Sequence, residues 1–393
     1  MKKLLFAYLK ALKRFKRWRL SLQGKTFKDL DDPAIVTGQA WEEFCDNLKA
    51  AGAALINGNA PQDPFNQAEG YKYLMRLTRV GLDYFVEYSN PGFPALKRLV
   101  HETVKIGADN PDNYYQNAMI SGEFEYRITG RRNTIPFLTF HTLDGQFASP
   151  EGVHPCGNLS VEELVLEADG SFEITLSKTQ KGKNWLPISD QTSMLIVRQT
   201  FQHRDQEQVA EVQLECLNGP TVPPPITPSD IVKALDTAGL FVGGTAIQFS
   251  NWSNSFTKHS NQLPELDPKL ADGAGGDDRL VYYHSHYKLA DDECLVIETA
   301  VPKCDYWNFQ VNNYWMESLD YRYEKIHVNN ATAKYNPDGT VTVVVAKQPV
   351  DHPNYLTTQG HHQGTMLWRW LLPDQKIQPK CRVMKISAFM AEQ

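Results

Sequence analysis

The segment 305–322, DYWNFQVNNYWMESLDYR, combines a strand pattern with side chains that could bind a ligand. Its first half alternates with a period of two, so Asn308 and Gln310 share one face while Trp307 and Phe309 share the other. Asn is a poor strand former, so the amide face needs a reason. Amides both donate and accept hydrogen bonds, as recognition of sugar-like hydroxyl groups requires. The pattern predicts a polar cavity, or alternatively an internal hydrogen-bonded network that holds no ligand.

Three further polar residues follow this strand and could act on a bound molecule. Arg322 could clamp a carboxylate or phosphate with two parallel hydrogen bonds. Tyr321 offers a hydroxyl group, and Glu317 offers a carboxyl group for acid/base chemistry. Because all three come just after the strand, the chain can return them over its amide face.

The segment 354–370, NYLTTQGHHQGTMLWRW, supplies a second set of candidates. His361 lies between two glycines and could act as a general base with Glu317, or could be a solvated residue in a tight turn. Arg369 lies between Trp368 and Trp370, which must point to the opposite face. A buried Arg needs a partner, and Glu317 or a bound anion would serve. We expect one concavity lined by Asn308, Gln310, Tyr321, Arg322, His361 and Arg369.

Metal and cofactor motifs are weak or absent in this sequence. His284 and His286 share a strand face, but no acidic residue follows at the spacing of a cupin metal site. The sequence contains no P-loop, no GxGxxG after a strand and no GxSxG. We therefore predict neither a metal site nor a cofactor.

The elements that must position these residues indicate an α+β fold, with a helical N-terminal part followed by antiparallel β-sandwich or jelly-roll layers. Helices are predicted at about 37–51, 67–88 and 229–256 from their apolar spacing. Five regions follow from the changes of periodicity: a basic amphipathic arm (1–24), a helical region (25–106), a first β region (107–220), a helix and mobile loop (221–278), and a C-terminal jelly-roll-like β domain (279–393).

Strand patterns fill the two β regions. In the first we expect a strand at 135–143, a hairpin of 163–167 with 172–177, and a pair of 194–201 with 208–217. In the second we expect two facing antiparallel sheets with 306–315 as a central strand. The other strands expected there are 280–287, 294–301, 331–335, 341–346 and 365–372.

Charge and cysteine usage restrict the partners and the compartment. The first 28 residues hold ten Lys and Arg and no acid, which leaves a net charge of −16 on the remainder. An acidic body repels phosphate, so we do not expect nucleic acid as a partner. The six cysteines are scattered singly, which is typical of reduced thiols and a cytoplasmic protein.

The basic arm fits an amphipathic helix over residues 1–22. Leu5, Leu9 and Leu12 share an apolar face, and Lys10 and Lys13 lie on the opposite one. This pattern predicts either an anchor on an anionic surface, such as the inner membrane, or a terminal helix that packs on protein.

Three stretches resemble a large, mainly bacterial family known as a domain of unknown function, number twelve-fourteen. They are ADNPDNYYQNAMISGEFEYRITGRR (108–132), YWNFQVNNYWMESLDYR (306–322) and NYLTTQGHHQGTMLWRW (354–370). The resemblance implies a jelly-roll-like domain at the C-terminal end. It implies no settled activity and no cofactor.

Two functions are consistent with these patterns. In the first, a β-sandwich cavity binds a polar, glycan-like or carboxylated small molecule and transforms it by acid/base chemistry. In the second, the chain is a non-enzymatic module tethered to a membrane by its arm. The amide face favours the first function, because a scaffold gains little from it.

Replacing Leu5, Leu9 and Leu12 by Ser tests the anchor. We expect the variant to be released from anionic vesicles, because it loses the apolar face that enters the lipid, and high salt should weaken binding of the unmodified chain. Vesicle sedimentation measures both effects. Equal sedimentation of the full chain and a chain lacking residues 1–24 would rule the anchor out.

Overall fold

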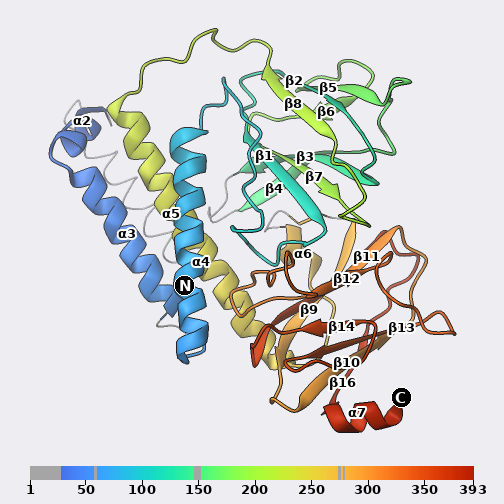
Figure 1. Cartoon of the computed structure of the whole chain (residues 1–393). Helices are drawn as coiled ribbons and strands as arrows, with labels where there is room; N and C mark the ends of the chain where they lie inside the picture. The colour runs from blue at the N-terminus through green and yellow to red at the C-terminus, as the bar shows by residue number, and fades with distance from the viewer. Residues whose placement is uncertain (1–27, 57–59, 146–151, 273–275, 278) are drawn as a thin grey trace.

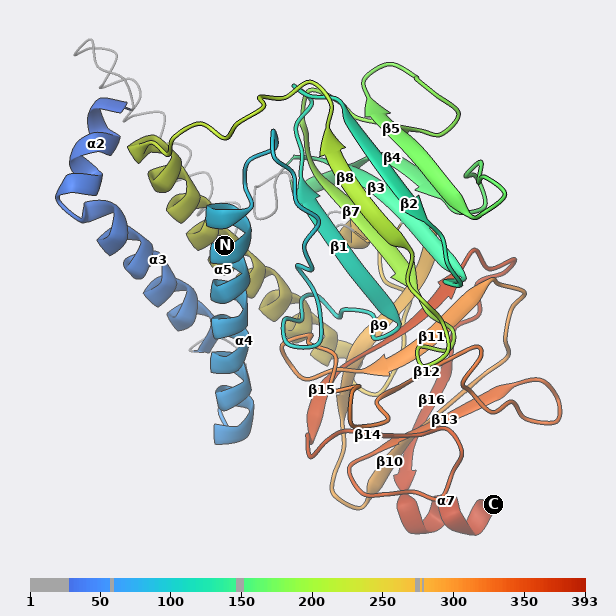
Figure 2. The same cartoon turned by 45° about the horizontal axis from the view of Figure 1, so that its top comes forward.

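The computed structural model describes residues 28–56, 60–145, 152–272, 276–277 and 279–393. The basic arm predicted at 1–24 lies outside these residues. Figures 1 and 2 show a layer of helices along one side of two β-sandwiches, one above the other. The fold is therefore α+β with antiparallel-rich layers, as the sequence predicts.

The long helices belong to two separate parts of the chain. They are α2 (Lys28–Val36), α3 (Gln39–Ile56), α4 (Pro64–Leu82, continued by a π-helical turn at Asp83–Glu87) and α5 (Pro228–Phe256). Asp63 caps α4 by accepting a hydrogen bond from the Asn66 amide at 3.0 Å. Thr227 and Asp230 form a reciprocal capping box at the start of α5. Each cap fixes where its helix leaves the preceding loop.

The first sandwich consists of two four-stranded sheets with the orders β1-β7-β3-β4 and β6-β5-β2-β8. Its buried core lies between them, with Leu195 and Val197 from one sheet and Ile128 and Ile174 from the other. The strands are β1 (Asn113–Met119), β2 (Tyr126–Arg131), β3 (Phe137–Gly145), β4 (Val153–Ser160), β5 (Ser171–Ser177), β6 (Trp185–Pro187), β7 (Thr192–Thr200) and β8 (Glu211–Cys216).

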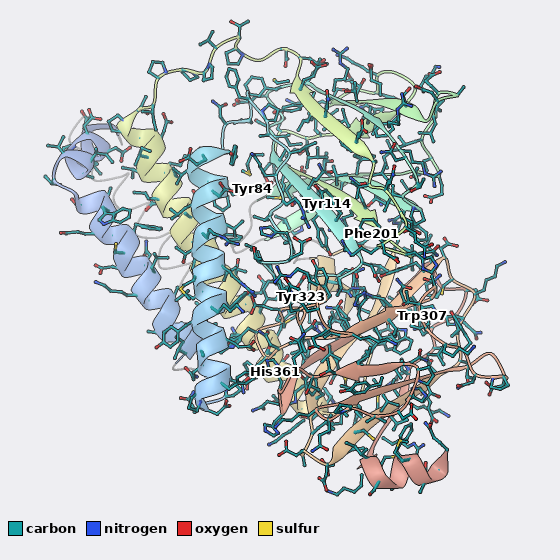
Figure 3. The ribbon with its side chains drawn as sticks, in the orientation of Figure 1. Tyr84, Tyr114, Phe201, Trp307, Tyr323 and His361 are labelled. Carbon is teal, nitrogen blue, oxygen red and sulfur yellow. The ribbon has the colours of Figure 1, made fainter. Side chains whose placement is uncertain are left out.

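The second sandwich also has two four-stranded sheets, with the orders β12-β11-β15-β9 and β14-β13-β10-β16. Trp307 and Trp368 stack at 4.9 Å in the core between its sheets. Figure 3 labels Trp307 within this sandwich. The strands are β9 (Leu280–Lys288), β10 (Glu293–Thr299), β11 (Tyr306–Val311), β12 (His327–Asn329), β13 (Val341–Ala346), β14 (Tyr355–Thr357), β15 (Gln363–Leu371) and β16 (Lys380–Lys385). Short helices are η2 (Thr257–His259), α6 (Pro268–Asp272) and α7 (Ile386–Glu392).

The prediction of two facing sheets around residues 306–315 is confirmed, because β11 is an internal strand and no part of 293–301 or 306–315 is helical. All the pairs are antiparallel except β5 with β6 and β13 with β14. The finer jelly-roll connectivity stays a prediction.

Several predicted boundaries are wrong for local reasons. The strand ends at Val311 because Asn313 accepts hydrogen bonds from the Trp315 and Glu317 amides and forms a turn. The predicted pair of 194–201 with 208–217 is absent, because β7 and β8 belong to different sheets. Residues 163–167 form turns and coil, and 331–335 has only one bridge, at Tyr335.

The helical region also differs in detail from its prediction. Thr37 donates to the Pro33 carbonyl at 2.8 Å, so it closes α2 and does not cap the next helix. Gly52 lies inside α3, which continues because Leu55 is fully buried. The region predicted as a helix and mobile loop, 221–278, also contains α6.

Helix α4 meets the second sandwich at Gly70. A Cβ there would lie 2.6 Å from the buried ring of Trp315, whose Nε1 donates to the Asn66 carbonyl at 2.9 Å. The helix can therefore approach this indole only through a residue without a side chain.

Substitution Gly70→Ala should lower the free energy of unfolding by about 1–2 kcal/mol. The added methyl group forces the Trp315 indole to move, and the cost of that movement exceeds the gain in helix propensity. The matched control is Gly243→Ala in α5, where the nearest neighbour is 3.7 Å away. That control should raise stability by about 0.5–1 kcal/mol. Urea unfolding measures both, and equal effects of the two variants would contradict this packing.

Candidate functional site

A cavity lies where α5 meets both sandwiches, and its volume is about 210 Å³. Alternate residues of β1 and β7 form one wall, and alternate residues of β9 and β15 form the opposite one. Helix α5 closes the third side with Phe241, Phe249 and Trp252. The cavity is therefore built from three segments that are far apart in the sequence.

Arg369 of β15 is a buried cation in the wall of this cavity, with 5% of its surface exposed. Its Nη1 donates to Asn308 Oδ1 at 3.2 Å and to Gln310 Oε1, and its Nη2 donates to the Ala108 carbonyl at 2.5 Å. All three acceptors are neutral. Among the residues that the structure describes, no carboxylate forms an ion pair with Arg369.

The amide face of β11 therefore holds this arginine. Asn308 also donates to Asn110 Oδ1 at 2.8 Å, and Gln310 donates to the Asp109 carbonyl at 2.9 Å. These bonds tie the second sandwich to the segment that leads into β1. The amides that the sequence singles out are fully buried supports of Arg369, and neither of them lines the cavity.

A second chain of polar groups extends from the same face. Tyr306 donates to Asp112 Oδ2 at 2.6 Å, and His327 lies 3.0 Å from Asp112 Oδ1. Burial raises the pKa of Asp112, but the nearby His327 and the hydrogen bonds lower that pKa further, so it lies below its usual value. Asp112 is therefore a fixed negative charge within the network, and Tyr306 is the member that lines the cavity.

His361 and Glu317 lie away from the cavity, against α4. His361 Nε2 is 2.6 Å from Glu69 Oε2, its Nδ1 is 2.6 Å from the Thr358 carbonyl, and its ring packs on Phe65. Neither ring nitrogen is left for a reaction in this arrangement.

Glu317 accepts hydrogen bonds from Arg76 at 2.5 Å and from Asn313 at 2.8 Å. Burial raises the pKa of Glu317, and the Arg76 guanidinium partly offsets this. Its partner is thus Arg76 and not Arg369. Both expected catalytic residues connect the second sandwich to α4.

Tyr321 and Arg322 lie outside the cavity as well. Arg322 is paired with Asp320 at 2.7 Å, and its side chain is 37% exposed. The Tyr321 ring is covered by Lys105 and Arg204, whose charged groups lie 4.7 Å and 5.4 Å from its centre. The structure therefore brings together Asn308, Gln310 and Arg369, and it does not gather Tyr321, Arg322 and His361, or the expected catalytic Glu317, around the same concavity.

Sequence reasoning missed the other half of the cavity. Arg198 of β7, Tyr115 of β1, and Tyr282 and His284 of β9 all line it. The available signal was Arg198, which directly follows the apolar run MLIV and is a charged residue in a strand pattern, as Arg369 is between its two indoles. Without the topology, nothing indicated that the two strands face one space.

Two titratable groups of the cavity, Tyr282 and His284, are held neutral by burial. Burial raises the pKa of Tyr282 to about 12, so it is a hydroxyl donor at neutral pH. Burial and the Arg369 charge lower the pKa of His284 to about 3. Its Nε2 is buried without a hydrogen-bond partner among the described residues. This nitrogen is an unused polar group in the wall of the cavity.

Two carboxylates also line the cavity, and both already have partners. Asp277 accepts from Arg279 Nη2 at 2.8 Å and from Arg279 Nε at 3.0 Å. Asp109 accepts from the Ser318 amide and hydroxyl at 3.0 and 2.8 Å. Neither is thus the counter-ion that Arg369 lacks.

Within the described ranges no group of three or more His, Cys, Asp and Glu is placed to hold a metal ion. In the same residues no helix combines the length and the apolar character that crossing a bilayer requires.

The fold and its internal cavity define a two-sandwich protein with a helical layer. A family model described as "Protein of unknown function (DUF1214)" matches residues 112–201 and 285–375. The chain is 43% identical to an uncharacterized protein from Burkholderia cenocepacia whose crystal structure is known, over 91% of this chain and 99% of that one, with a TM-score of 0.89. The chain therefore belongs to this family of unknown function, and the resemblance seen in the sequence is confirmed at that level.

A second solved structure is more distant. The VPA0106 protein from Vibrio parahaemolyticus is 13% identical, over 86% of this chain and 100% of that one, with a TM-score of 0.46. No curated protein matches the chain.

Substitution His284→Phe should flatten the acid side of the stability profile. The folded-state pKa of His284 is about 3 and its unfolded value is about 6.5, so between these values the unfolded chain binds more protons and stability falls as pH falls. At pH 5 this costs about 2 kcal/mol relative to pH 7 or above, and the Phe variant should be spared it.

Urea unfolding at pH 5 and pH 7 measures the difference, with the exposed His154→Phe as control. Phe keeps a ring against Phe256, which lies 4.5 Å from the imidazole centre. An unchanged pH dependence in His284→Phe would show that this imidazole is not held neutral in the fold.

Proposed function

We propose that this protein binds a small carboxylated molecule in the cavity between its two sandwiches, with Arg369 as the anchor. The observation that supports the proposal is the buried guanidinium whose acceptors are all neutral. Removing a charge from water without a counter-ion costs several kcal/mol. A bound carboxylate would offset that cost.

The hydrogen bonds of Arg369 leave room for such a partner. A guanidinium has five N–H donors. Three are used, which leaves Nε–H and one Nη2–H without a partner among the described residues. Two donors on one guanidinium match the two oxygens of a carboxylate. The three acceptors fix the orientation of the guanidinium, and so of its two remaining N–H donors, before any ligand binds. This lowers the entropy cost of binding.

The walls suit a molecule with a polar end and an apolar body. Tyr115 and Tyr282 offer hydroxyl groups, and Phe137, Phe249 and Leu367 offer apolar surface. An apolar pocket with a few convergent polar groups is the usual form of a small-molecule site. For scale, a cavity of about 150 Å³ binds benzene. At about 210 Å³, this one suits a ligand of about ten non-hydrogen atoms.

His284 is the candidate for acid/base chemistry on the ligand. Among the described residues it is the one imidazole in the cavity wall with a ring nitrogen that has no hydrogen-bond partner. His361 and Glu317 give no such support, because each is bonded within the contact with α4. The jelly-roll connectivity of the second sandwich remains part of the proposal.

The second candidate is a non-enzymatic module that its basic arm tethers to the cytoplasmic face of a membrane. The specific support is the spacing of Leu5, Leu9 and Leu12 opposite the Lys and Arg residues of the arm. Binding of a small molecule would not exclude tethering. A protein that sediments with anionic vesicles and responds to no carboxylate would favour this candidate over the first.

Thermal unfolding with a panel of carboxylates tests the first proposal. At about 100 times its Kd, a bound ligand should raise Tm by roughly 2–5 °C, because it stabilises only the folded state. Arg369→Gln should remove the response. Arg382→Gln, a charge removal at an exposed site, is the matched control and should keep it.

The variant itself needs a stability check. Arg369→Gln leaves the acceptors of Asn308, Gln310 and Ala108 unsatisfied, which costs about 1–3 kcal/mol each, while it also removes an unpaired buried charge. Arg369→Lys keeps the charge and should respond weakly. A carboxylate that raises Tm equally in wild type and Arg369→Gln binds elsewhere and would contradict the proposal.

A further inference from the structure

The two sandwiches have the same topology, strand for strand. The order β1-β7-β3-β4 becomes β9-β15-β11-β12 when eight is added to each number, and β6-β5-β2-β8 becomes β14-β13-β10-β16. Even the parallel pairs correspond, β5 with β6 and β13 with β14. The same family model matches residues 112–201 and 285–375, which start near β1 and β9 and end near β7 and β15. The chain therefore contains an internal duplication, in which the second sandwich repeats the first.

The strand registers identify equivalent residues at the cavity. In the first sandwich Tyr115 is the cross-strand partner of Arg198, and in the second Tyr282 is the cross-strand partner of Arg369. Each pair thus consists of a tyrosine from the first strand and an arginine from the seventh. We call them the Tyr–Arg pairs.

The turns that precede the two tyrosines are also equivalent. The Asn110 amide donates to the Tyr115 hydroxyl at 3.0 Å, and the Asp277 amide donates to the Tyr282 hydroxyl at 3.1 Å. Both bonds span five residues, and the side chains of both Asn110 and Asp277 accept a backbone amide two residues on. The same device positions each phenol. The Tyr282 hydroxyl also donates to the Asp277 carbonyl, but at 3.4 Å this bond is longer than a normal O–H···O hydrogen bond, so the hydrogen can turn to a better acceptor.

Both Tyr–Arg pairs line one cavity, and each arginine affects the pKa of both tyrosines. Burial raises the pKa of Tyr115 and of Tyr282, and the charges of both Arg198 and Arg369 lower each of these pKa values in part. Each phenol is therefore within electrostatic reach of both guanidinium groups. Of the carboxylates in the wall, Asp109 accepts from Ser318, and Asp277 accepts from Arg279 and also lies within electrostatic reach of Arg198.

We propose that the natural ligand is a small dicarboxylate, with one carboxylate at each Tyr–Arg pair. This inference rests on the proposed function and specifies its ligand. Two equivalent cationic sites on opposite walls fit two anionic groups, because each carboxylate can accept from one guanidinium and one phenol. The apolar part of the cavity lining, which includes Phe137, Ile196 and Leu367, fits a short aliphatic linker between the carboxylates.

The size of the cavity restricts the linker. A ligand of about ten non-hydrogen atoms corresponds to an aliphatic dicarboxylate of about four to six carbons. Succinate, glutarate and adipate are therefore the probes. Butyrate, valerate and hexanoate are their matched controls, because each has the same number of carbons and one carboxylate fewer. Inorganic phosphate tests the alternative that both arginines share a single dianionic group.

Isothermal titration calorimetry of the full chain compares these probes in wild type, Arg198→Gln and Arg369→Gln. We expect at least one dicarboxylate to bind about tenfold or more tightly than its matched monocarboxylate, since a second charged hydrogen-bonded contact is worth this much. In Arg198→Gln the preference should disappear while monocarboxylate affinity changes less than about threefold. In Arg369→Gln binding of both kinds should be lost.

The outcomes separate this inference from the proposed function. Binding of monocarboxylates at Arg369 without any preference for dicarboxylates overturns the inference and leaves the proposed function intact. A preference that persists in Arg198→Gln also overturns it, as does tight binding of phosphate that no dicarboxylate displaces. Absence of any carboxylate binding to wild type overturns both. Arg198→Lys is the control for loss of folding. It should have an unchanged Tm and should keep a reduced preference for dicarboxylates over monocarboxylates.

Discussion

The structure depends on the burial of one guanidinium. Arg369 is taken out of water by the indoles on its own strand, which must occupy the core of the second sandwich. Its charge is then held by Asn308, Gln310 and the Ala108 carbonyl, all neutral. Hydrogen bonds orient a buried charge, but they compensate it less completely than an opposite charge does. This imbalance explains both the amide face of β11 and the capacity of the cavity for an anion.

The same interaction joins the two halves of the chain. Asn308 continues to Asn110, and Asn110 lies in the turn that starts β1 of the first sandwich. The relative position of the sandwiches, and so the shape of the cavity between them, is tied to the orientation of Arg369. On the far side, α4 is fastened to the second sandwich by Glu317 with Arg76 and by His361 with Glu69. Polar pairs thus fix the layers, while apolar cores fill them.

The sequence predicts the parts of this account that depend on local pattern. Alternation identifies β11 and places Asn308 and Gln310 on the side opposite Trp307, and the indoles around Arg369 predict its burial and its need for a partner. The helix of α5 is also predicted nearly to the residue, since its cap and its apolar spacing are local.

The parts that depend on distant contacts were not predictable from one sequence. Nothing local indicates that His361 and Glu317 meet Glu69 and Arg76, which are more than two hundred residues away. The predicted pairing of β7 with β8 was wrong, because strands that are adjacent in the sequence can belong to different sheets of a sandwich. The duplication was hidden because it preserves strand order and a few residues, such as Arg198 and Arg369, while most side chains differ.

The central claim is that the cavity between the sandwiches binds an anionic molecule through the charges of Arg369 and Arg198. A crystal structure of the protein grown with a four- to six-carbon dicarboxylate tests it most directly. We expect density within the cavity, with one carboxylate in hydrogen-bond distance of Arg369 Nε or Nη2 and the other beside Arg198 and Tyr115. A ligand bound on the surface, or one inside the cavity with its carboxylates turned away from both arginines, would contradict the claim.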